Sequence, residues 1–188
     1  KRFVNSLISN VSSTISLIKK KKFNSIILNF DENSEDLFKW YQQLIAESLG
    51  KKSKGLLPVI SNLPRDNHSM MQLYLDGPRN NFYTFFDVLD SPKNSYLAKI
   101  KLAQKKATKI VFKKKKLPFR CLNLRDRSEG SLGEIFTFFM LETILIGEAL
   151  NLNPFDQPAV EQIKIETKKI IKNLKFNKKY PRDPVYFF

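Results

Sequence analysis

Cysteine and long apolar runs are nearly absent from this sequence. Cys121 is the single cysteine, which excludes an internal disulfide and suits a reducing cytosol. The apolar stretch Ile135 to Leu141 is bounded by Glu134 and Glu142, well short of the roughly 20 residues that a membrane helix needs. We therefore expect no membrane span, and no secretory signal is visible at the start of the sequence.

Histidine and arginine are also scarce. His68 is the single histidine, and the sequence contains no cluster of Cys and His side chains that could hold a metal. The formal net charge of +15 comes mostly from lysine, in the segments Lys19 to Lys22 and Lys113 to Lys116 and on a helical face that includes Lys105. A solvated lysine coat and a nucleic-acid-binding surface both fit this pattern, and either charge distribution would attract an anionic metabolite.

The chain is long enough for one domain. Its 188 residues, 42% of them hydrophobic, can bury one full core, so we expect a single domain over residues 1–188. The sequence begins at Lys1 without an initiator methionine, which suggests a fragment of a longer chain.

Short apolar runs alternate with segments of helical periodicity. The runs predict strands at Ser25 to Phe30, Leu56 to Ile60, Asn81 to Leu89 and Pro118 to Leu124. The helical segments are Phe3 to Ile18, Asn33 or Ser34 to Gly50, Asp66 to Gly77, Ser95 to Phe112, Ser131 to Leu150 and Pro158 to Leu174. This order predicts an α/β fold, a three-layer sandwich in which a mainly parallel sheet has helices on both faces.

Two of these helices carry specific expectations. The helix Ser131 to Leu150 is mostly apolar, so we expect it to be buried on most of its circumference. The last helix should direct its apolar stripe inward, with Val160, Ile163, Ile170, Ile171 and Leu174 in the core.

Glu47 stands out in the helix that ends at Gly50. Leu37, Trp40 and Tyr41 begin the apolar stripe of that helix, and Glu47 lies at its edge, one turn beyond Gln43. Partial removal from water would disfavour the charged carboxylate, as a general base at neutral pH requires. A solvated helix residue near the Gly50 cap explains the same spacing.

His68 and Lys164 are the other candidates for proton transfer. His68 follows a predicted strand, and its imidazole could pass protons near neutral pH, with Asp66 or Ser69 setting its tautomer. Lys164 falls on nearly the same helical face as Gln157 and could donate a proton or contact an anion. An exposed lysine beside Glu161 is an equally good interpretation.

Three segments, in this order, resemble the C-terminal half of the glucose-6-phosphate isomerase family. They are WYQQLIAESLGK, PRDNHSMMQLYLDGPR and NPFDQPAVEQIK, and the resemblance extends from about Ser25 to Lys172. The stretch from Pro92 to Pro118 matches least, and Ala159 and Ile163 depart from the family's usual residues. The family has two sugar isomerase (SIS) domains, each with a five-stranded parallel sheet between helices, and this chain resembles the second.

The resemblance implies an activity and a set of residue roles. The activity is the interconversion of glucose 6-phosphate and fructose 6-phosphate through a cis-enediol, with no metal or organic cofactor. Glu47 would be the base that moves a proton between C1 and C2, and His68 and Lys164 would assist ring opening. Gln43 and Gln157 match positions that contact the sugar-phosphate substrate.

The resemblance also implies partners. The family is a cytoplasmic homodimer, in which His68 would complete the site of the neighbouring subunit. The N-terminal SIS domain, which supplies an arginine and a phosphate loop, would be missing, so we expect the fragment to be inactive alone. Residues 175–188 would form a C-terminal tail, whose aromatic end could pack against the partner subunit.

Two alternatives come from other functional classes. One is a non-catalytic SIS domain that senses a sugar phosphate, against which the retained Glu47, His68 and Lys164 argue. The other is a basic nucleic-acid-binding module, which tight, sequence-selective binding would favour. Our hypothesis is the isomerase, with no nucleic-acid partner.

Overall fold

The computed structural model of the chain describes residues 1–89 and 95–174. It contains two compact units, Lys1–Phe155 and Asp156–Phe188. The tail expected at residues 175–188 lies outside the described residues.

The first unit is built on a parallel sheet. Its strands are β1 (Asn24–Asn29), β2 (Leu57–Asn62), β3 (Asn81–Val88) and β4 (Phe119–Leu124), in the order β2-β1-β3-β4. All three pairings are parallel, which confirms the predicted sheet type. The five strands expected from the family are four among the described residues, in agreement with the four apolar runs in the sequence itself.

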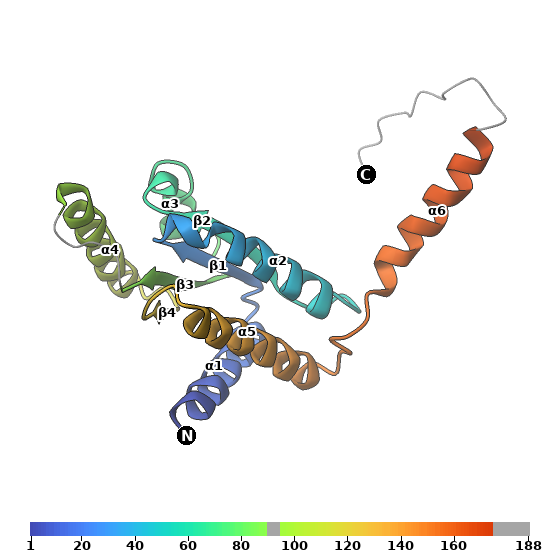
Figure 1. The fold of residues 1–188 in the computed structure, drawn as a ribbon, viewed down its shortest axis with the longest axis horizontal. Helices are drawn as coiled ribbons and strands as arrows, with labels where there is room; N and C mark the ends of the chain where they lie inside the picture. Colours follow the sequence, from blue (N-terminus) through green and yellow to red (C-terminus); the bar gives the residue numbers. More distant parts are fainter. Residues whose placement is uncertain (90–94, 175–188) are drawn as a thin grey trace. The chain divides into compact units, whose positions relative to one another are not determined.

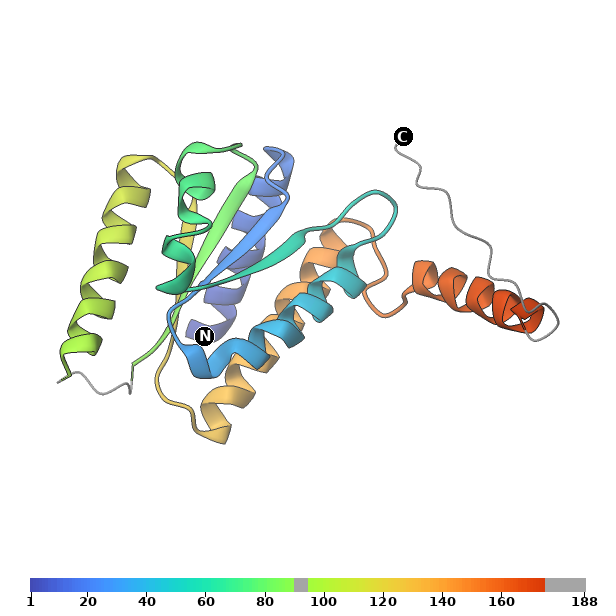
Figure 2. The same cartoon turned by 90° about the horizontal axis from the view of Figure 1, so that it is seen from above.

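Helices cover both faces of this sheet (Figures 1 and 2). One face carries α1 (Arg2–Lys19), α2 (Glu35–Leu49) and α5 (Glu129–Ala149), and the other carries α3 (Met71–Asp76) and α4 (Tyr96–Lys114). Short 3-10 turns precede α2 and α3, at Glu32–Ser34 and Arg65–Asn67. The helix after β1 lies on the opposite face from those after β2 and β3 because the chain reverses its direction across the sheet at β2.

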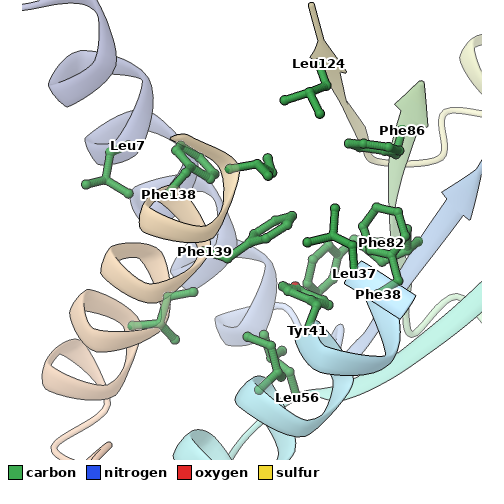
Figure 3. Packing of buried hydrophobic residues seen from close by; sticks show 14 of the residues in the cluster. Leu7, Leu37, Phe38, Tyr41, Leu56, Phe82, Phe86, Leu124, Phe138 and Phe139 are labelled. Atoms are coloured by element: carbon green, nitrogen blue, oxygen red, sulfur yellow. The ribbon is translucent and has the colours of Figure 1, made fainter. Parts of the chain in front are cut away.

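Two apolar cores lie on the two faces of the sheet. Ile26 and Leu28 of β1 belong to one core and Ile27 to the other, because successive side chains of a strand point to opposite faces. The rings of Phe38 and Phe86 pack edge to face with their centroids 4.7 Å apart, inside the larger core (Figure 3). A strand buried on both sides therefore explains the continuous apolar run in the sequence.

Helix α2 is buried over a wider sector than its stripe predicted. Tyr41 is buried as expected, whereas Trp40 is only partly buried. The additional buried residues are Phe38, Ile45 and Leu49, each 1% exposed or less. The sector widens because α2 packs against the sheet and also against α5, where Tyr41 meets Phe139 (Figure 3).

Helix α5 is less completely buried than expected. Phe138 and Phe139 lie in the core, but Met140, Leu141 and Leu145 are each about 40% exposed. By length and composition alone, α5 is long and apolar enough to cross a membrane, although a core helix passes the same test. Glu142, which ended the expected apolar stretch, is itself only 2% exposed, and the buried part of α5 continues past it to Ile146 and Gly147.

The second unit contains α6 (Pro158–Leu174). The inward stripe predicted for this helix is wrong within the unit, because all five residues that were predicted to lie inward are exposed. Their exposed fractions are 39% for Val160, 70% for Ile163, 56% for Ile170, 49% for Ile171 and 39% for Leu174. The reason is that α6 is the one described element of its unit and has none of its own to pack against.

Candidate active site

Ligands of parallel α/β sheets usually bind where the strands end, which we call the carboxyl edge. Here several side chains at that edge form hydrogen bonds with one another. Arg127, which follows β4, donates to the buried carboxylate of Asp31, and the Ser34 hydroxyl donates to the same carboxylate at 2.5 Å. Ser34 precedes α2 but makes no side-chain cap bond, because its hydroxyl is directed to Asp31.

The same bonding continues across the ends of β1 and β2. The Asn29 amide donates to the Asn62 side-chain oxygen at 3.0 Å, and the Asn62 backbone N–H donates to Asp66 Oδ2 at 2.8 Å. Asp126, beyond β4, accepts bonds from the hydroxyls of Ser128 and Ser131, which lower the pKa of its carboxyl group. The charged and polar groups at this edge thus bind one another.

His68 is presented at the carboxyl edge, just after β2. Its side chain is exposed, and it follows the 3-10 turn Arg65–Asn67. Neither predicted orienting residue is bonded to the imidazole in the described structure. Asp66 instead accepts bonds from Ser61, Asn62 and Arg65, because it faces back toward the end of β2.

Glu47 lies near the opposite end of the sheet, the amino edge, where the strands begin. Helix α2 starts near the end of β1 and runs back toward the start of β2, where Gln42 Nε2 donates to the Pro58 carbonyl at 3.0 Å. Glu47 is one turn further along and half-buried. The expected pairing with an amide is present, since Gln43 Nε2 donates to Glu47 Oε1 at 3.1 Å.

The loop after α5 reaches this same end of α2. The Lys51 amine donates to the Asn153 carbonyl, and the Lys54 amine donates to the Leu150 carbonyl at 2.8 Å. Gly147 permits this approach, because a Cβ there would lie 3.2 Å from Pro154 and 3.5 Å from Leu49. The fold therefore joins the first of the three family-like segments to the beginning of the third, which are about 100 residues apart in the sequence.

Gln157 and Lys164 belong to the second unit, and both are exposed there. The Lys164 amine lies 2.5 Å from Glu161 Oε1, one turn earlier on α6. Within its own unit, Lys164 is thus an exposed lysine beside Glu161, as the alternative interpretation of the sequence expected. Its role and that of Gln157 stay predictions.

A buried ion pair that was not predicted from the sequence lies beneath α2. Arg120 of β4 donates through two nitrogens to Glu142 of α5, and its Nε donates to Thr84 Oγ1 at 2.9 Å. Burial by itself lowers the pKa of the Arg120 guanidinium. The interactions with Glu142 and Tyr41 raise this pKa by more than burial lowers it, so the net shift is upward. Burial raises the pKa of the Tyr41 phenol, which lies beside this pair, because it disfavours the charged phenolate. The signal available in the sequence was a glutamate, Glu142, inside an otherwise apolar helix.

Two surface cavities lie along α1, away from the candidate residues. One, of about 590 Å³, is lined by α1, Phe82, Phe119 and Arg120, and the other, of about 520 Å³, lies between α1 and α5. Neither is lined by Gln43, Glu47 or His68. The candidate residues of the first unit therefore lie on its surface and outside both cavities.

The donor groups do not suggest a metal centre. Within residues 1–89 and 95–174, no group of three or more His, Cys, Asp or Glu side chains could hold a metal ion. The chemistry that Gln43 and Glu47 can perform is proton transfer by a carboxylate that a neighbouring amide holds in place.

The fold and these residues define the class of protein: an α/β domain with a parallel sheet and a carboxylate–amide pair at the end of its first crossover helix. No protein-family model matches the sequence. In sequence, the chain is 31% identical over 160 residues to glucose-6-phosphate isomerase of Methanocaldococcus jannaschii, across 78% of the chain and 40% of that relative. It is 33% identical over 174 residues to the same enzyme of Mycoplasmopsis pulmonis, across 82% of the chain and 41% of that relative.

Solved structures show the same fold. A hypothetical protein from Thermus thermophilus superposes with a TM-score of 0.72 at 24% identity, over 85% of this chain and 44% of the other. A glucose-6-phosphate isomerase from Chlamydia trachomatis gives a TM-score of 0.71 at 17% identity, over 81% and 35%. The chain belongs to the glucose-6-phosphate isomerase family, and it spans about two fifths of the length of the relatives it matches.

Proposed function

We propose that the chain is the C-terminal SIS domain of an aldose-ketose isomerase that interconverts glucose 6-phosphate and fructose 6-phosphate through a cis-enediol. The observation that carries the proposal is the contact between Gln43 and Glu47 at the end of α2, inside the segment most like the family. Similarity to glucose-6-phosphate isomerases over about 80% of the chain supports it.

In this mechanism Glu47 takes a proton from C2 of the open-chain sugar and returns it to C1, or the reverse. A carboxylate suits this step because the same group must accept and then give back one proton. The Gln43 amide holds the Glu47 carboxylate and contacts the substrate. His68 and Lys164 assist the opening of the sugar ring, and Gln157 contacts the substrate.

The positions of Glu47 and His68 in the first unit support a homodimer. Glu47 lies toward the start of β2 and His68 beyond its end, and a six-residue strand spans about 20 Å. Because one sugar phosphate is shorter than this separation, the imidazole in each site would come from the neighbouring subunit. A cytoplasmic location belongs to the same proposal.

In this proposal, an N-terminal SIS domain outside residues 1–188 would complete the substrate site. It would supply a positive group that stabilises the enediolate and a loop that binds the phosphate. Gln43 and His68 are exposed in the first unit and Glu47 is only half-buried, which supports an incomplete site. We expect residues 1–188 alone to be inactive, and turnover of fructose 6-phosphate by this chain alone would contradict that expectation.

Exchange of the substrate's C2 proton with solvent tests the role of Glu47 in the full-length protein. We expect Glu47→Gln to lower the exchange rate by about 10²- to 10⁴-fold, the usual contribution of a general base. Glu35→Gln is the matched control, because Glu35 lies on the same helix and pairs with Lys39 at the surface. Undiminished exchange in Glu47→Gln would show that the assignment of the base is wrong.

The nucleic-acid alternative is not favoured. Several lysines of the basic regions are paired with carboxylates, as in Lys101 with Glu32 at 2.8 Å and Lys115 with Asp76 at 3.5 Å. No relative named above is a nucleic-acid-binding protein by its name.

A further inference from the structure

The carboxylate of Asp66 holds the turn that carries His68. Asp66 Oδ2 accepts two hydrogen bonds, from the Ser61 hydroxyl at 3.0 Å and from the Asn62 backbone N–H at 2.8 Å. Both donors belong to the last two residues of β2, and Ser61 is fully buried. The bonds therefore attach the turn to the end of β2, which is held by its parallel pairing with β1.

The backbone of Asp66 fixes the other side of the turn. Its carbonyl accepts the Met70 N–H at 2.9 Å, and Met70 in turn accepts the Tyr74 N–H at 3.1 Å at the start of α3. His68 lies between these attachments, and its own N–H donates to the Arg65 carbonyl at 3.3 Å. One residue thus joins the end of β2 to the beginning of α3, with the exposed imidazole between them.

We infer that Asp66 is a positioning residue, which fixes the place where His68 is presented. It does this through the backbone of the turn and not through a bond to the imidazole. The inference rests on the proposed function, in which His68 assists ring opening. A side chain that must reach a substrate bound to the neighbouring subunit gains most from a fixed backbone, since a small displacement weakens proton transfer strongly.

Three variants of the full-length protein test the inference. Asp66→Ala removes both bonds to β2. Asp66→Asn keeps an oxygen that can accept them, so it should restore the function. Asp76→Ala is the matched control, because Asp76 is an exposed carboxylate at the end of α3 whose contact is with Lys115.

The activity assay compares two substrates. Fructose 6-phosphate must open its ring before isomerisation, whereas a four-carbon aldose 4-phosphate cannot close one. We expect Asp66→Ala to lower kcat/KM for fructose 6-phosphate by roughly 10- to 100-fold. Exchange of the C2 proton of the four-carbon substrate, which needs Glu47 and not His68, should stay at the wild-type rate. Asp66→Asn and Asp76→Ala should resemble wild type with both substrates.

Amide hydrogen exchange gives a second measurement that does not depend on activity. The amides of Asn67, His68 and Met70 should exchange faster in Asp66→Ala than in wild type and Asp66→Asn. If Asp66→Ala does not fold, Ser61→Ala, which removes one of the two bonds, should show the same changes at smaller size.

The outcomes separate the two proposals. Equal loss of activity with both substrates, unchanged activity, or unchanged exchange of the turn amides would each overturn the role of Asp66. Wild-type protein that fails to isomerise fructose 6-phosphate would instead refute the proposed function, whatever the amides do.

Discussion

The two edges of the sheet differ in how their polar groups are used. At the carboxyl edge, Asn29, Asp31, Asn62 and Asp66 bind one another and the neighbouring turns. At the amino edge, Gln43 and Glu47 make a bond with each other at the surface of α2. Ligands of parallel sheets usually bind at the carboxyl edge, but here these four side chains have partners within the protein.

The two edges therefore differ in what most of their polar groups do: those at the carboxyl edge stabilise the fold, and those at the amino edge are available to a substrate. Groups that satisfy one another in a buried place stabilise the fold and hold loops in position. A carboxylate that must exchange protons with a substrate has to remain accessible, and Glu47 is half-buried on the surface of its unit. Substitutions of Asp31 and Asp126 at the carboxyl edge, and of Glu142 beneath α2, should therefore change stability, whereas those of Gln43 and Glu47 should change activity.

The largest loss of stability should come from the buried pair beneath α2. Glu142→Ala leaves the Arg120 guanidinium without the carboxylate that binds it, so we expect the free energy of unfolding to fall by about 3–5 kcal/mol. Urea denaturation measures this change. Glu142→Gln, which keeps an acceptor for Arg120, should lose less, and equal stability of Glu142→Ala and wild type would contradict the importance of the pair.

A smaller loss should follow from Asp31→Ala at the carboxyl edge. Asp31 is 6% exposed and accepts bonds from Ser34 and Arg127, so we expect a loss of about 1–3 kcal/mol in the same assay. Asp36→Ala is the control, because Asp36 is an exposed carboxylate near the same helix start, paired with Lys39. The comparison fails if both variants lose the same stability.

Asp126 should make the carboxyl edge sensitive to acid. The bonds from Ser128 and Ser131 lower the pKa of the folded carboxyl group below its ordinary value of 3.8. A depressed pKa stabilises the fold at pH values above that ordinary value, and the contribution is lost as the pH falls toward the lower pKa of the folded state. Asp126→Ala should thus be less stable than wild type at pH 7, and the difference should shrink below about pH 4. Melting temperatures across this range measure it, and a constant difference would count against the shift.

The smallest change in stability, and the sharpest contrast, should come from adjacent glutamines on α2. Gln43→Ala removes an exposed i,i+4 pair, so we expect a loss of at most about 0.5 kcal/mol together with a higher KM in the full-length protein. Gln42→Ala removes the bond to the Pro58 carbonyl, so we expect about 1 kcal/mol lower stability and unchanged KM. The same effect of both substitutions on KM would remove the distinction between activity and stability at this edge.

Much of the fold could be predicted from short-range patterns. The four apolar runs predicted the four described strands to within a few residues, and the direction of pairing followed from the helices between them. The contact between Gln43 and Glu47 was also accessible, because residues four apart on a helix are neighbours.

Other features depended on partners that local sequence does not reveal. Ile163 and Ile170 have the same spacing as a buried stripe, yet they are exposed in a unit with no other described element. Asp66 is close to His68 in the sequence, but its side chain is turned back to β2. Periodicity gives the face of a helix, and it does not give the surface on which that face packs.

The sequence by itself determined the alternation of strands and helices and the residue types available for proton transfer, because both depend on neighbours within a few positions of the chain. Only the tertiary structure decided that Glu47 lies toward the amino edge and His68 at the carboxyl edge, and that Arg120 meets Glu142. The physical reason is that crossovers between parallel strands carry each segment from one end of the sheet to the other, and only the folded chain fixes which segments then meet.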